Sequence, residues 1–73
     1  MKKNSDLVKF GLNVRRIRLK KGLSQSALAK QAGLSLNYIG TLERGVQNPS
    51  LKTLEKLAKG LGCSMSETCR GIK

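Results

Sequence analysis

Serines that can begin helices and glycines that can end them divide most of this chain into short segments. A serine hydroxyl accepts a hydrogen bond from a free N–H of a helix's first turn, and a glycine tolerates the left-handed backbone that closes the last turn. Ser24, Ser35 and Ser50 each stand before an apolar pattern with helical spacing. The sequence therefore predicts helices over about 25–32, 36–44 and 51–61.

The flanking residues predict two further helices. Near the start of the chain, apolar residues recur at spacings of three and four and share one face of a helix over about 5–21; they are Leu7, Phe10, Val14 and Ile17. The helix after Ser50 also has an apolar face, made by Leu51, Leu54, Leu57, Ala58 and Leu61, and we expect Gly60 and Gly62 to fray its end. Ser64 can cap a last helical turn or two that reaches about residue 70. Because strand-like alternation is absent, we expect an all-α fold, a compact five-helix bundle that forms one domain over residues 1–73.

The charge of the chain is strongly one-sided. It carries 15 Lys plus Arg against 4 Asp plus Glu and no His, a formal net charge of +11. A partner is therefore expected to be negatively charged, and nucleic acid is the first candidate. A chain of 73 residues with no His and few carboxylates cannot easily assemble a deep substrate cavity, an acid/base pair or a metal cage. We expect no enzymatic activity, no cofactor, no metal and no small-molecule substrate.

Two absences point to the cytoplasm. No run of about 7–15 apolar residues follows the basic Lys2 and Lys3, so a secretory signal is not predicted. No stretch approaches the roughly 18 apolar residues that span a bilayer, so we expect no membrane partner. Cys63 and Cys69 are too few for a disulfide scaffold or a zinc site, and we expect both as reduced thiols.

The segment QSALAKQAGLSLNYIGTL, residues 25–42, has the spacing of a helix-turn-helix. Small Ala29 lets two helices approach closely, Gly33 allows the turn, and Ile39 and Leu42 face the core. In such a unit the first helix holds the second helix so that it projects from the protein surface. The N-terminal side chains of the second helix can then enter a DNA major groove, which is about 12 Å wide. The segment predicts binding to double-stranded DNA.

The chain resembles the phage-repressor-like (XRE-type) helix-turn-helix regulators, which include the Cro and lambda-repressor DNA-binding domains. The resemblance covers residues 10–65 and rests on the marks GLSQ, AL-A, AG-S, YI, LERG, NPS and L-LAK-LG-S, which occur in order. It implies a five-helix fold and a sequence-specific transcriptional regulator that acts on double-stranded DNA.

The resemblance also implies which residues meet DNA. Base contacts are expected from Ser35, Leu36, Asn37 and Thr41. Asn37 is the first choice, because an amide can bind adenine N6 and N7 together. Phosphate contacts, which set register rather than sequence, are expected from Ser24, Gln25, Ser26, Tyr38, Arg44, Asn48 and Lys52.

Several of these residues have a second interpretation. Leu36 either contacts a thymine methyl or is an ordinary exposed leucine. Gly40 either lets the backbone approach DNA or has no role, and Asn48 either contacts phosphate or only shapes the turn before Pro49. We expect most of the basic residues before Gly22 to form a solvated charged face, to which Lys2 and Lys3 belong unless they form a mobile arm that attracts DNA.

The resemblance further implies a structural ion pair and a dimer. Arg18 and Glu43 match a pair that joins the first helix to the end of the recognition helix, so Glu43 is not expected to be a catalytic acid. A homodimer on a near-palindromic operator is expected to use a C-terminal interface formed by Leu61, Cys63, Met65, Thr68, Cys69 and Ile72. Thr68 and Cys69 stand where large apolar residues are more usual, so we expect a weak dimer that DNA completes.

Repression by blocking polymerase is the simplest output, and activation requires contact with polymerase. A restriction-modification controller or an antitoxin-like autoregulator is the alternative regulator. A nonspecific DNA-compacting protein would explain the charge but not the detailed sequence LNYIGTLERG of the recognition helix. A membrane-active helix would need its apolar face for lipid, whereas the apolar stripes of this chain are better used in packing against each other. A protein-interaction module is the remaining rival.

Overall fold

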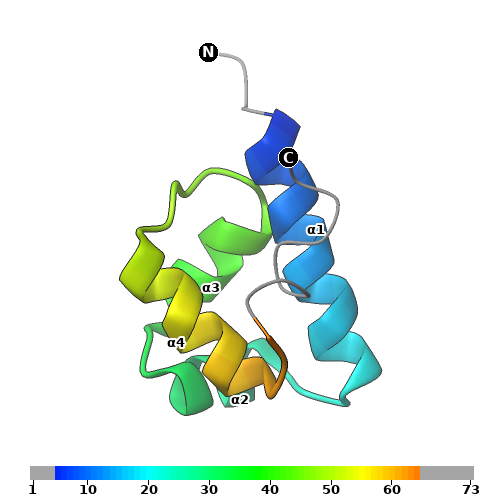
Figure 1. Ribbon diagram of the computed structural model, residues 1–73. Coiled ribbons are helices and arrows are strands. Elements are labelled where there is room, and N and C mark those ends of the chain that lie inside the picture. The colour runs from blue at the N-terminus through cyan, green and yellow to red at the C-terminus, as the bar shows by residue number, and fades with distance from the viewer. Residues whose placement is uncertain (1–4, 65–73) are drawn as a thin grey trace.

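The computed structural model describes residues 5–64, which form four α-helices joined by short loops (Figure 1). They are α1 (Ser5–Lys20), α2 (Gln25–Ala32), α3 (Leu36–Glu43) and α4 (Leu51–Leu61). No strand occurs within this range, so the all-α prediction is confirmed for it. The count of five helices is wrong for these residues, since they hold four. The fifth helix was expected over about 64–70, and apart from Ser64 that segment lies outside the described residues.

Serine side chains begin three of the four helices, as predicted. The hydroxyl oxygens of Ser24 and Ser35 accept hydrogen bonds from the backbone N–H groups of Ala27 and Tyr38, both at 3.0 Å. Ser50 accepts one from the N–H of Thr53 at 3.2 Å. A cap of this kind contributes about 1 kcal/mol to helix stability. Short helices of this length are marginal alone, so such local contributions add to the packing that holds them.

The turn between α2 and α3 is tight because Gly33 adopts a left-handed backbone, with φ of +70°. The N–H of the next residue, Leu34, then reaches back to the carbonyl of Ala29 at 2.9 Å. Leu34 packs against the core from this position. Only Leu34 and Ser35 remain between Gly33 and the start of α3, so α3 leaves the turn in a direction that α2 sets.

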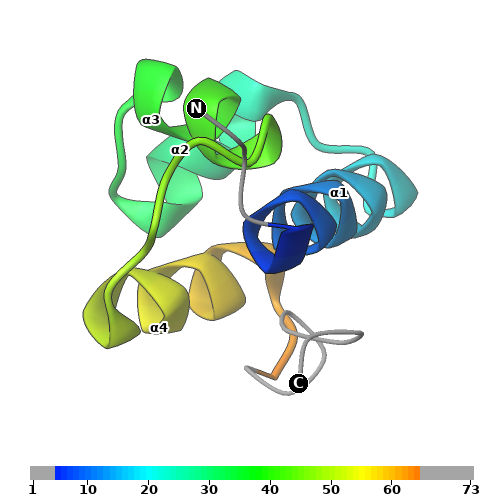
Figure 2. The same cartoon turned by 90° about the horizontal axis from the view of Figure 1, so that it is seen from above.

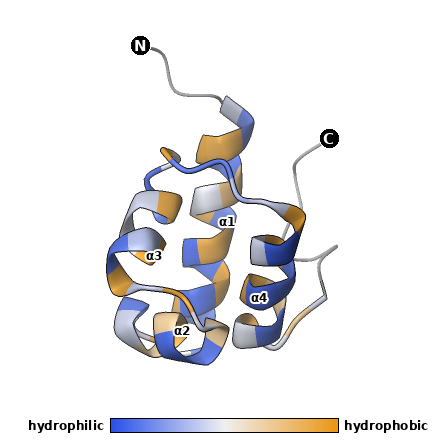
Figure 3. Cartoon of the chain, turned by 90° about the vertical axis from the view of Figure 1, so that its left-hand side faces the viewer, coloured by the Kyte–Doolittle hydropathy of each residue, from blue (hydrophilic) through white to orange (hydrophobic). Residues whose placement is uncertain are grey.

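One core unites the helices. Seen from above, α1, α4 and the α2–α3 pair surround it on three sides (Figure 2). Hydrophobic and hydrophilic residues alternate along each helix (Figure 3). The core is built from Phe10, Val14 and Ile17 of α1, Leu28, Ala29 and Ala32 of α2, Ile39 and Leu42 of α3, and Leu57 and Leu61 of α4. Each large side chain of this set stabilises the fold by roughly 1.5–3 kcal/mol through burial.

Leu51 does not join this core, contrary to the expectation from its spacing. It is 66% exposed, whereas Leu54 is half-buried and Leu57 is fully buried. Burial thus increases along α4, and the first turn of the helix extends beyond the core. Helical spacing identifies the face of a residue but not the point along the helix at which the neighbouring helices begin to cover it.

Two glycines inside helices allow close approach between helices. A Cβ on Gly60 would lie 2.9 Å from the Cβ of Ala32, at the contact of α4 with α2. Gly60 is therefore buried within α4, and the prediction that it frays the helix end is wrong. A Cβ on Gly11 would lie 2.4 Å from the carbonyl oxygen of Leu42 and 2.7 Å from that of Glu43. Gly11 therefore lets α1 touch the backbone at the end of α3.

This contact predicts opposite effects for two glycine substitutions. Gly11→Ala should lower the free energy of unfolding by about 1–3 kcal/mol, because the added methyl overlaps α3 backbone. Gly40→Ala is the matched control: Gly40 is also inside a helix, but its Cβ would meet only an Arg44 side-chain nitrogen at 3.8 Å. That variant should gain about 1 kcal/mol from helix propensity. Urea denaturation measures both, and equal stabilisation by the two alanines would contradict the α1–α3 contact.

Candidate nucleic-acid interface

Helix α3 has one side in the core and the other in solvent. Its inner side carries Ile39, Leu42 and Glu43, all buried. Its outer side begins at the exposed Ser35, Leu36 and Asn37, and Leu36 is 52% exposed. The structure thus brings three of the four expected base-contacting residues together at the start of α3. A helix held in this way can enter a major groove by its N-terminal residues.

Thr41, the fourth of these residues, is already engaged within the protein. Its hydroxyl donates to the carbonyl oxygen of Tyr38 at 2.9 Å and lies 3.2 Å from that of Asn37. The same oxygen accepts a hydrogen bond from the side-chain amide of Gln47 at 3.0 Å. With its only proton used by the helix, Thr41 has its methyl group and one lone pair left for a base.

Gln47 is a residue that sequence reasoning missed. It lies in the loop after α3, and its hydrogen bond to Thr41 holds its side-chain amide beside α3, in addition to the amide of Asn37. Helical spacing carries no signal for it, because a loop residue belongs to no helix face. The one sign that the sequence offered was the position of this amide side chain between the LERG and NPS marks.

The expected phosphate-contacting residues lie on three segments. Ser24, Gln25 and Ser26 are at the start of α2, Tyr38 and Arg44 are on or just after α3, and Asn48 and Lys52 flank the start of α4. Most of their side chains are exposed, whereas Tyr38 is half-buried and packs against the core. The Ser24 hydroxyl accepts from the helix, so it still has its proton to donate to a phosphate.

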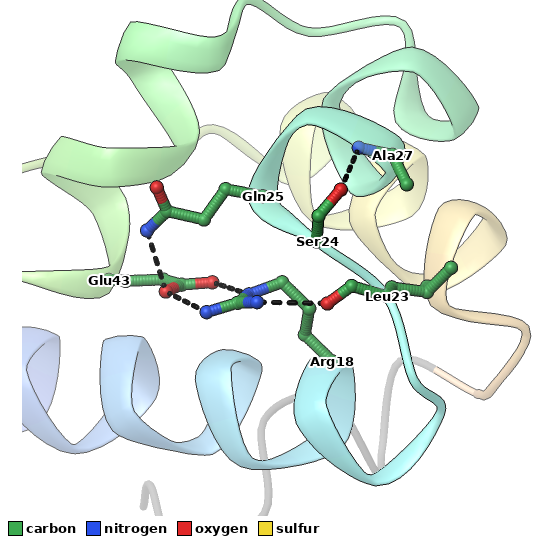
Figure 4. A network of polar contacts seen from close by, with 6 residues as sticks. All are labelled: Arg18, Leu23, Ser24, Gln25, Ala27 and Glu43. Carbon is green, nitrogen blue, oxygen red and sulfur yellow. Dashed lines mark hydrogen bonds and ion pairs between the residues drawn. The ribbon is translucent and has the colours of Figure 1, made fainter.

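Arg18 and Glu43 form a buried ion pair that joins α1 to the end of α3 (Figure 4). Arg18 donates from Nε to Glu43 Oε2 at 2.7 Å and from Nη2 to Oε1 at 3.1 Å. Its Nη1 donates to the carbonyl of Leu23 at 2.9 Å, and the amide of Gln25 donates to Glu43 Oε1 at 3.1 Å. The pair is bidentate and its charges are nearly removed from water, with side chains 9% and 4% exposed. Glu43 is thereby a structural residue that holds α3 against α1 and the start of α2.

Gly40 sits on the outer half of α3, one turn after Leu36. A Cβ there would meet only Arg44 Nη1, at 3.8 Å, so the protein itself does not require a glycine at this position. The open space beside Gly40 is compatible with both interpretations of this residue, close approach of the backbone to DNA and the absence of any role.

The structure separates the expected dimer residues. Leu61 is 1% exposed and belongs to the core of its own chain, so its assignment to an interface is wrong. Leu61 belongs to the apolar face of α4, and this face packs against α2 within the same chain. Cys63 is half-buried and packs against the core. Met65, Thr68, Cys69 and Ile72 lie outside the described residues, as do Lys2 and Lys3 of the expected arm.

Residues 5–64 contain neither a cluster of metal-ligating side chains nor a helix that could span a membrane. Within that range no three His, Cys, Asp or Glu side chains come together as a metal site. None of the helices described is long and apolar enough to cross a membrane.

Comparison with known proteins identifies the family. A helix-turn-helix family model matches residues 14–67, and the chain belongs to this XRE-type family of DNA-binding transcriptional regulators. Control protein C.BamHI of Bacillus amyloliquefaciens is 48% identical over 54 residues, which are 73% of this chain and 67% of that protein. Control protein C.MunI of a Mycoplasma species is 38% identical over 71 residues, 96% of each chain. The crystal structure of the restriction-modification controller protein C.AhdI of Aeromonas hydrophila superposes with a TM-score of 0.87 at 46% identity, over 89% of this chain and 98% of that chain.

The ion pair predicts a large stability effect at Glu43. Glu43→Gln should lower the free energy of unfolding by about 3 kcal/mol or more, because it leaves the Arg18 guanidinium buried without its counter-charge. Glu55→Gln, at an exposed position of α4, is the matched control and should change stability by less than about 0.5 kcal/mol. Urea denaturation measures both, and similar values for the two variants would show that the pair does not hold α3.

Proposed function

We propose that this protein regulates transcription as a homodimer that binds a near-palindromic operator, with α3 of each protomer in a major groove. One observation carries the proposal: α3 presents exposed Ser35, Leu36 and Asn37 at its start, while the Arg18–Glu43 pair anchors its end. A surface helix fixed at one end and open at the other can dock in a groove without rearrangement. Repression by blocking polymerase is the simplest output of such a complex.

The exposed residues of α3 and its surroundings divide into two roles in this proposal. Asn37 binds an adenine edge, Leu36 contacts a thymine methyl, and Ser35 bonds to a neighbouring base. Thr41 contributes its methyl group, since its hydroxyl proton serves the helix. Backbone phosphates are held on both sides of the groove by Ser24, Gln25, Ser26, Tyr38, Arg44, Asn48 and Lys52.

A dimer is part of the proposal because α3 is short. Its eight residues extend about 12 Å and reach only a few base pairs. Two copies that contact half-sites about 34 Å apart on one face of DNA provide the missing specificity. In this proposal the interface involves Cys63 together with Met65, Thr68, Cys69 and Ile72.

A restriction-modification controller is the candidate regulator that the comparisons favour. The alignment with control protein C.MunI extends over 96% of both chains, and controller protein C.AhdI matches over nearly its whole length. We infer that the chain controls expression of restriction-modification genes. Restriction and methyltransferase genes next to its own gene would support this role over that of a phage repressor.

Selection from a randomised duplex library at about physiological salt tests sequence-specific binding, because nonspecific binding is weak there. We expect enrichment of a two-fold symmetric motif. Asn37→Ala should then lose about 1–3 kcal/mol of preference, roughly 5- to 150-fold, at one base pair of each half-site. Gln31→Ala removes an exposed amide from the other end of α2 and should leave the motif unchanged. A folded protein that enriches no motif would reject the regulator in favour of a DNA-compacting or protein-interaction role.

Sedimentation tests the assembly. The protein alone should be monomeric at low micromolar concentration, and two copies should bind one symmetric duplex. A stable dimer without DNA would contradict the proposal that DNA completes a weak interface, and one copy per symmetric duplex would contradict the dimer itself.

A further inference from the structure

A shallow hollow lies between α1 and the outer half of α3, beside the start of α2. It is lined by Arg15, Arg18, Gln25, Gly40, Glu43 and Arg44. The charges of Arg18 and Glu43 compensate each other through their ion pair. Arg15 and Arg44 remain, both exposed, and leave the hollow with a net charge of +2. Two guanidinium groups at one open hollow form a site for an oxyanion, which they bind with planar, paired N–H donors.

The close contact at Gly11 explains how Arg15 comes to this place. Gly11 touches the end of α3, and Arg15 and Arg18 follow it at intervals of four and three residues on the same side of α1. The helix thus carries two arginines along its contact with α3. Arg18 turns into the buried pair, whereas Arg15 stays at the surface of the hollow.

The opposite wall of the hollow is open because Gly40 has no side chain. Only Arg44 Nη1 would lie near a Cβ at that position, at 3.8 Å. Arg44 follows Gly40 by one helical turn and lines the same hollow. The amide of Gln25, an expected phosphate contact, is bonded to Glu43 at the edge of this space. The hollow therefore adjoins the side of α3 that faces DNA in the proposed complex.

We infer that this hollow receives a backbone phosphate of the bound DNA, held by Arg15 of α1 together with Arg44. The inference rests on the proposed function and adds a DNA contact from α1, where most basic residues were expected to form a solvated charged face. The contact provides affinity and register without sequence preference. A structural explanation of the same residues is that both arginines compensate the negative end of the α3 dipole.

The salt dependence of DNA affinity separates these explanations. Arg15→Ala and Arg16→Ala remove the same charge from adjacent exposed positions of α1, but the Arg16 guanidinium bonds to Asn13 Oδ1 at 2.7 Å and does not line the hollow. We measure the affinity of each variant for the selected duplex, and for a scrambled one, between low and physiological salt. Arg15→Ala should reduce the slope of log affinity against log salt by about 0.9 per protomer. Arg16→Ala should stay near the wild-type slope, and Arg15→Lys should retain it.

Each outcome is decisive. Equal slopes for Arg15→Ala and Arg16→Ala would overturn the phosphate contact, even if the wild-type protein enriches its motif as proposed. A loss of stability in Arg15→Ala with an unchanged slope would assign the arginine to the helix dipole instead. A loss of affinity confined to the selected duplex would point to a base contact and would also overturn the inference. If the wild-type protein binds no duplex, the proposed function and this inference fall together.

Discussion

The bidentate pair between Arg18 and Glu43 sets the position of α3, and the candidate interface depends on that position. Both side chains are nearly inaccessible to water, and each makes one more hydrogen bond, Arg18 to the Leu23 carbonyl and Glu43 from the Gln25 amide. Within residues 5–64, no buried side-chain nitrogen or oxygen lacks a hydrogen-bond partner. The attraction between two buried charges offsets the cost of removing them from water only when the geometry is good and further hydrogen bonds are present. The network thereby connects α1, the following loop, α2 and α3 at a single point.

Close contacts between helices, made possible by glycines, also hold α3 in its position. Gly11 lets α1 approach the last carbonyls of α3, and Gly33 allows the tight turn that brings α3 back across α2. Ile39 and Leu42 fill the core from the inner side of α3. The outer side is left with side chains that make few contacts in their own chain. Rigidity on one side and accessibility on the other come from the same eight residues.

Much of the fold could be predicted from sequence because its signals are local. Ser24, Ser35 and Ser50 cap the helices that their positions predicted, and the apolar stripe of α1 is buried apart from half-buried Leu7. The errors concern contacts between segments. Leu51 and Leu61 share a helical face, yet one overhangs the core and the other lies inside it. Spacing along one helix cannot show which other element covers a face, so it could not correct the assignment of Leu61 to a partner chain that the family resemblance implied. In the same way, the Thr41–Gln47 bond and the hollow beside Arg15 depend on packing between elements.

The division of α3 into an anchored inner side and a free outer side has an evolutionary consequence. Leu36, Asn37 and Gly40 contribute little to the core, so substitutions there can change the preferred operator with little loss of stability. Changes at Ile39, Leu42 or Glu43 would instead compromise folding before they altered recognition. Related chains can therefore diverge in DNA target while they keep one scaffold. A newly acquired copy of such a gene could be retargeted by very few mutations, which would keep its regulatory circuit separate from that of its parent.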